Sequence, residues 1–262
     1  MLLLLAGLAC GPGDPGAASA PAPCRPGSAP AGHTRSVTLQ VRVGPGVDPD
    51  AVQARLDRDR ELAAWLGLSL VADGPPRPVA LDAPIGGDSA IPASDGRTAG
   101  GGSVDAGKGA GDRAAGGDDR AARARRLFAP ALGLLADRDA AAPADTVDIV
   151  VTRRLVAEQS SAGEALARLE AFTVSPRMAP ATAGGFDLSA LLPPGYRPTV
   201  FVSWRAWSQD RAAPVDSLLV HELGHALGLS HVDDPDNLMG PRRWSSCLPV
   251  IDEAQWEVIR SR

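Results

Sequence analysis

Three of the four histidines in the chain lie in one short stretch, residues 220–231, which reads VHELGHALGLSH. His221 and His225 are four residues apart, so on a helix they lie one above the other on the same face and could bind one ion. Glu222 follows the first histidine. Its side chain would point away from the two rings, yet stay close enough to handle a water molecule on that ion. The spacing therefore predicts a metal site with a carboxylate beside it.

The residues after this pair supply a third candidate ligand. Gly228 can adopt a left-handed backbone and end the helix, so the chain can turn back and present His231. Three histidines leave one tetrahedral position for water, which is typical of a catalytic zinc site rather than a closed structural one. The alternative is a helix whose histidines are ordinary surface or core residues. That interpretation must explain the histidines, Glu222, Gly228 and a following Met239 by coincidence.

The complete pattern H-E-x-x-H-x-x-G-x-x-H at residues 221–231 resembles that of the metzincin clan of zinc endopeptidases. Residues 237–241, Asn-Leu-Met-Gly-Pro, resemble the clan's Met-turn, and the Met-x-Pro form is most similar to the matrixin branch. One departure concerns the branch: matrixins often carry Ser directly after the third histidine, where this chain has Val232.

The resemblance implies one catalytic zinc ion and the hydrolysis of peptide bonds by metal-activated water, without a covalent intermediate. Glu222 would be the general base, and Met239 an apolar floor beneath the ion. The substrate would be a protein or peptide. The implied metal ligands are His221, His225 and His231.

The resemblance also implies a zincin-like α/β (α+β) fold, in which a twisted mixed sheet carries an active-site helix and a small C-terminal subdomain follows. Apolar periodicity and turn residues predict a compatible order of elements. The expected strands are 37–43, 68–71, 146–152, 171–175 and 198–204, and the expected helices are 48–66, 120–135, one from Pro214 through the motif, and 251–259. Pro176 suits an edge strand at 171–175, and in the clan such a strand binds substrate backbone by strand addition.

Composition divides the chain into unequal parts. We expect a leader at 1–10, a Pro/Ala/Gly-rich tether at 11–35 that includes the fourth histidine, and a catalytic domain at 36–262. Residues 74–119 contain almost no large apolar groups, so they cannot offset the entropy of ordering and are predicted to be a disordered insertion. Residues 184–197 are expected to be loop.

The first residues predict export, to the extracellular space or the cell envelope. A short apolar run, too short to span a bilayer, ends at Cys10 and resembles a bacterial lipoprotein signal, so Cys10 is a candidate for lipidation and membrane anchoring. Residue 7 is not the usual Leu, and no Lys or Arg precedes the run. A true start further upstream, or a mis-assigned start without function, is the alternative.

Two further cysteines, Cys24 and Cys247, could form a disulfide in an exported chain and tie the N-terminal arm to the C-terminal subdomain. A rival hypothesis makes Cys24 a latency thiol that blocks the zinc, but its flanking residues do not match the matrixin propeptide pattern.

Net charge is −5 without a basic block, so nucleic acid is not an expected partner. We also expect a monomer.

Asp233, Asp234 and Asp236 could orient a ligand histidine or bind calcium, although solvated turn acids are the simpler interpretation. Two other functions stay open: an exported zinc-binding lipoprotein without proteolytic activity, acting as an adhesin or scaffold, and a zinc hydrolase of a non-peptide bond. Glu222 argues against the first, because binding alone needs no base.

Overall fold

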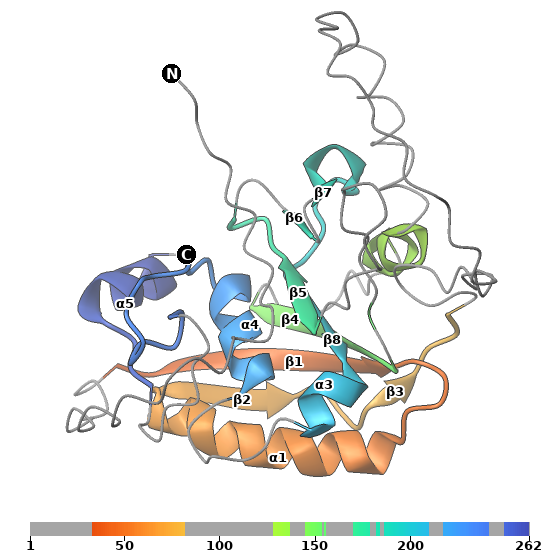
Figure 1. The fold of residues 1–262 in the computed structure, drawn as a ribbon, viewed down its shortest axis with the longest axis horizontal. Helices are drawn as coiled ribbons and strands as arrows, with labels where there is room; N and C mark the ends of the chain where they lie inside the picture. Colours follow the sequence, from red (N-terminus) through yellow and green to blue (C-terminus); the bar gives the residue numbers. More distant parts are fainter. Residues whose placement is uncertain are drawn as a thin grey trace, which may run out of the picture.

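The computed structural model describes residues 33–81, 128–136, 145–153, 155, 170–178, 182–183, 186–209, 217–240 and 249–261. Their centre is a twisted mixed sheet, which confirms the predicted α/β class (Figure 1). Its strands, in spatial order, are β2 (Leu68–Ala72), β1 (Arg35–Val43), β4 (Thr146–Thr152), β8 (Thr199–Ser203) and β5 (Ala171–Val174). The first four run parallel, and β5 is antiparallel to β8. Because β5 is last in the order, it lies at an edge.

One face of the sheet carries the main hydrophobic core. Alternate residues of β1, such as Leu39 and Val41, pack there with helix α1 (Pro49–Trp65), which links β1 to β2. Asp48 caps that helix by accepting the amide N–H of Asp50. Helix α4 (Leu218–Ala226), which contains the first two motif histidines, packs into the same core. The candidate metal helix therefore rests directly on the sheet.

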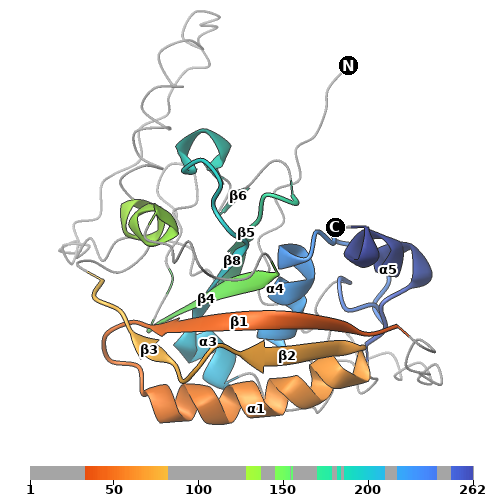
Figure 2. The same ribbon diagram turned by 180° about the vertical axis from the view of Figure 1, so that it is seen from behind.

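A second core covers the opposite face near β8 and β5. Residues 128–136 are helical and lie on the other side of the sheet from α1 (Figures 1 and 2). Phe172 of β5 stacks on Phe201 of β8 at 4.7 Å and meets Phe128 edge to face at 5.6 Å. Because Phe172 is held on this face, its neighbour Thr173 is directed to the face that carries α4.

Ordered residues lie at the margins of two predicted segments. Strand β1 includes Arg35, the last residue of the predicted tether 11–35, because Arg35 pairs with Leu68 of β2 and donates its N–H to the Gly67 carbonyl. Its guanidinium donates to the Ile259 carbonyl and pairs with Asp145, and His33 stacks on Trp256 at 5.4 Å. Within the first residues of the predicted insertion 74–119, β3 (Arg77–Pro78) pairs with β1 and Val79 donates its N–H to the Val43 carbonyl.

Other short elements were not expected. Strand β7 (Phe186–Asp187) and the 3-10 helix η1 (Ser189–Leu191) lie within the predicted loop, and β6 (Thr182–Ala183) pairs with β7. Helix α3 (Trp204–Gln209) begins where the predicted strand 198–204 ends.

The predicted leader 1–10 and most of the tether lie outside the described residues, as do residues 82–119 and the start of the helix at 120–135. No helix in the described ranges has the length and apolar character to cross a bilayer.

A buried ion pair on α1 is hydrogen-bonded to α3. Arg55 and Asp59 lie 3.3 Å apart, one helical turn from each other, and each is 3% exposed. Trp207, fully buried on α3, donates its indole N–H to Asp59 at 2.7 Å. A buried carboxylate is costly without donors, so the indole stabilises the contact between these helices.

Replacing Trp207 by Phe should lower the free energy of unfolding by about 1.5–3 kcal/mol, because a hydrogen bond to a buried carboxylate is lost. Urea unfolding measures this. Trp204→Phe, the same change at a partly exposed indole of α3, should cost less. Equal losses for the two variants would contradict the role given to the indole.

Candidate metal centre

Helix α4 begins one residue after Ser217, whose hydroxyl accepts the N–H of Val220 at 3.2 Å. Pro214 and Asp216, which were expected to begin it, lie outside the described residues. Every residue of α4 is buried. Its apolar residues fix the helix on the sheet, and its histidines therefore have a defined direction.

Gly228 ends this helix with φ 97°, the left-handed backbone that the sequence predicts. Gly228 donates its N–H to the His225 carbonyl at 2.9 Å, and Leu229 donates to the Gly224 carbonyl at 3.0 Å. These bonds satisfy carbonyls at the helix end and reverse the chain, so that His231 returns towards α4.

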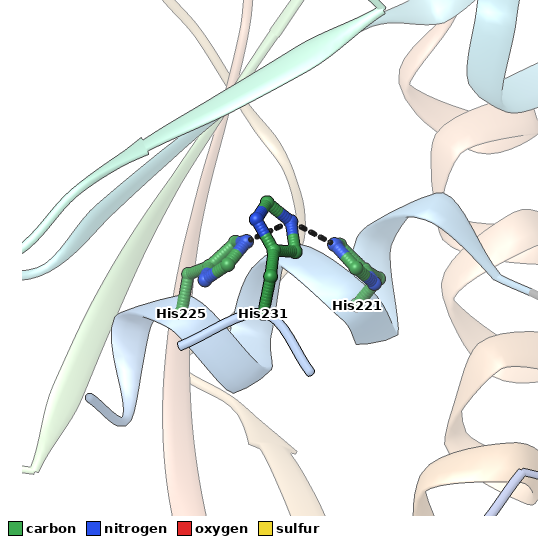
Figure 3. Close-up of side chains that lie close together, drawn as sticks. All are labelled: His221, His225 and His231. Carbon is green, nitrogen blue, oxygen red and sulfur yellow. Dashed lines mark hydrogen bonds between the residues drawn. The ribbon is translucent and has the colours of Figure 1, made fainter. Parts of the chain in front are cut away.

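The three histidines converge on one point (Figure 3). Nε2 of His231 lies 3.2 Å from Nε2 of His221 and 3.1 Å from Nε2 of His225. Zinc–nitrogen bonds of about 2.0–2.1 Å in a tetrahedron place two nitrogens about 3.3–3.4 Å apart. The two distances to His231 are close to this spacing, all three nitrogens lie within 4.8 Å of one another, and the donor set fits zinc.

The other ring nitrogens support this arrangement. Nδ1 of His221 lies 2.7 Å from the Leu238 carbonyl, and Nδ1 of His225 lies 2.8 Å from the Leu229 carbonyl. A carbonyl can only accept, so each Nδ1 must carry the proton. Each Nε2 then presents its lone pair to the common centre, as a metal ligand requires.

Burial also favours the neutral rings. It lowers the pKa of His225, against a smaller rise caused by the hydrogen bond to Leu229. Burial lowers the pKa of His231 as well, the neighbouring His225 lowers it further, and Glu222 raises it. An unprotonated imidazole is the form that binds a metal.

Glu222 lies next to the histidine cluster and is 3% exposed. Its Oε2 accepts a hydrogen bond from the hydroxyl of Thr173 on β5 at 2.6 Å. Thr173 was not among the predicted site residues. Nothing local marks it, because the contact joins residues 49 positions apart.

Met239 is fully buried and packs against Gly224, which lies between the two histidines of α4. A Cβ on residue 224 would collide with the Met239 sulfur, so glycine permits the close approach. Gly224 was not among the predicted site residues, although its place between the two histidines is a usable signal.

A pair of buried amides holds the turn that contains Met239. Asn237 and Gln255 exchange two hydrogen bonds, of 2.9 and 3.0 Å, and Asn237 also accepts the N–H of Met239. Gln255 belongs to helix α5 (Glu253–Arg260), where it forms a capping box with Asp252. The C-terminal helix thus fixes the turn whose Leu238 carbonyl orients His221. Gln255 was also missed.

The predicted cysteine sites cannot be placed. Cys10, Cys24 and Cys247 all lie outside the described residues.

Asp234, one of the acidic residues that could bind calcium, accepts the N–H of Asp236, as a turn residue does. Within the described ranges, the histidine trio is the one group of three or more potential metal-binding side chains.

Residues 167–246 match the family model of the matrixins, peptidase family M10, which confirms the resemblance over that part of the chain. No curated protein matches significantly.

Two solved structures are similar to this chain. Metalloproteinase-II from Bacteroides fragilis is 11% identical, with a TM-score of 0.42 over 88% of this chain and 55% of that one. Archaemetzincin from Methanopyrus kandleri is 14% identical, with a TM-score of 0.39 over 88% of this chain and 97% of that one. The chain thus spans about half the length of the first.

Gly224→Ala should destabilise the protein by about 1–3 kcal/mol, because the new methyl displaces the Met239 sulfur. Zinc affinity should fall as well, since Leu238 would move with its neighbour and release His221. Urea unfolding and a zinc titration measure the two effects. Gly133→Ala is the control, because nothing lies within 4 Å of a Cβ at that helical position. If both variants behave alike, the close approach is unimportant.

Proposed function

We propose that this chain is a zinc-dependent endopeptidase. The observation that carries the proposal is the convergence of three histidine Nε2 atoms beside the buried carboxylate of Glu222. The matrixin match over residues 167–246 supports it independently of the geometry. Binding alone would not require a carboxylate at this position.

His221, His225 and His231 would hold the ion through Nε2. When bound, zinc supplies Lewis acidity, which lowers the pKa of a water molecule towards about 7 and polarises a carbonyl. Glu222 would take a proton from the attacking water and later deliver it to the amine that leaves when the peptide bond breaks. Glu222 itself is only 3% exposed.

Strand β5 is the proposed place for the substrate backbone. It is the terminal strand of the sheet path, and within the described ranges no other strand of that sheet pairs with its outer side. An extended peptide could add there as a further strand, with main-chain hydrogen bonds giving affinity. Because Thr173 of β5 contacts Glu222, such a peptide would pass close to the base.

Export, with Cys10 as the lipidation site, belongs to the same proposal. It rests on the apolar run before that cysteine. Metabolic labelling with a fatty-acid analogue tests it, and Cys10→Ser should abolish the label. Label that survives the substitution would exclude Cys10.

His225→Ala should abolish stoichiometric zinc binding, because two nitrogens cannot replace three and the vacated volume admits water. Elemental analysis of the purified variant gives the metal content. The control is His33→Ala, which alters a histidine that packs on Trp256 away from the cluster and should keep zinc. Undiminished zinc in His225→Ala would refute the ligand assignment.

Glu222→Gln should keep zinc and lower turnover by several orders of magnitude, because the amide cannot accept the proton from water. A peptide-library digest, with and without chelator, measures activity and preference together. Near wild-type cleavage by the variant would overturn the mechanism. A wild-type protein that binds zinc but cleaves no peptide would instead favour the binding protein without proteolytic activity.

A further inference from the structure

Beyond the ligands and the base, we propose that Thr173 is a positioning residue for Glu222, so that the edge strand orients the carboxylate for proton transfer. The proposal rests on the proposed peptidase function for its kinetic consequence, while its geometric part concerns only the two side chains.

The contact between the two side chains is short and specific. The Thr173 hydroxyl lies 2.6 Å from Oε2 of Glu222, and a hydroxyl bonded to a carboxylate typically lies about 2.5–2.7 Å from it. The same hydroxyl is 3.1 Å from the Glu222 carbonyl. The hydroxyl has one proton, and it donates that proton to Oε2, which is the nearer acceptor and carries charge. The bond fixes the rotation of the carboxylate, and hence the direction of its second oxygen.

The donor itself is held firmly. Thr173 pairs with Val200 in the sheet, and its neighbour Phe172 is locked in the opposite core. A β-branched side chain has restricted χ1 rotation, so the hydroxyl keeps one direction. The sheet thus holds β5 in place, β5 directs the Thr173 hydroxyl, and that hydroxyl orients the Glu222 carboxylate.

A purely structural role is the competing explanation. Ser175, the residue after β5, makes such a contact, since its buried hydroxyl donates to the Ala226 carbonyl at 3.0 Å and links the end of the strand to α4. If Thr173 only fastened β5 to α4, its loss would lower stability and leave the chemical step intact. The experiment must therefore separate turnover from folding.

Thr173→Val keeps the shape of the side chain and removes the donor. We expect kcat to fall about 10- to 100-fold, the range for a lost hydrogen bond to a charged group. KM should change less than about twofold, and zinc content should not change, because the substitution leaves the main chain of β5 and the metal ligands unaltered. Thr173→Ser, which keeps the hydroxyl, should restore kcat to within about threefold of wild type.

Thr199→Val is the matched control. Thr199 lies on the neighbouring strand β8, is buried, and donates its hydroxyl to the Arg197 carbonyl rather than to Glu222. The Thr199→Val variant should unfold at a lower urea concentration than wild type and keep the wild-type kcat. Unchanged kcat in Thr173→Val, or equal kcat losses in Thr173→Val and Thr199→Val, would overturn the proposal.

A spectroscopic readout decides the question even if the wild-type protein cleaves no peptide. Co²⁺ replaces the metal, and its visible absorption reports the groups that surround it. Thr173→Val should shift the bands in the direction that Glu222→Gln shifts them, and adding Thr173→Val to Glu222→Gln should cause no further shift. Thr173→Ser and Thr199→Val should match wild type. A wild-type spectrum for Thr173→Val would overturn the positioning role, whereas a lack of peptide cleavage by wild type would overturn only the proposed function.

Discussion

The convergence of three imidazole nitrogens is the constraint on which the rest of the site depends. Nε2 of His231 lies 3.1–3.2 Å from Nε2 of the two helical histidines, so the backbone must hold three rings at one point. It does so through the carbonyls of Leu238 and Leu229, which bind the outer nitrogens of the two helical rings. The left-handed residue Gly228 brings the third ring to the same point.

Three parts of the surrounding fold hold the histidine cluster and Glu222 in place. The main core holds α4 against the sheet, the second core locks β5 through Phe172, and α5 holds the turn at Asn237 through Gln255. Each support reaches the site through one or two hydrogen bonds or one packing contact. Supports of this kind hold the ligand rings in the orientation that a metal ion requires.

The helical spacing of the motif predicted the site residues that act locally. The positions of His221 and Glu222 on one helix, and the reversal at Gly228, follow from periodicity and from the conformational freedom of glycine. The sheet strands were predicted because their β-branched alternation is a local property. The contacts of Thr173 and Gln255 could not be predicted, since each depends on elements distant in sequence that meet only in the fold. Strand β3 was missed for the same reason, because pairing with β1 orders residues whose composition alone favours disorder.

The central claim is that three imidazoles hold one zinc ion. X-ray absorption spectroscopy of the zinc-loaded protein tests it most directly, because it reports the type and number of atoms bound to the metal. The account predicts three histidine nitrogens and one oxygen at about 2.0–2.1 Å. A spectrum with two or fewer histidines, or with a sulfur ligand from a cysteine, would contradict it.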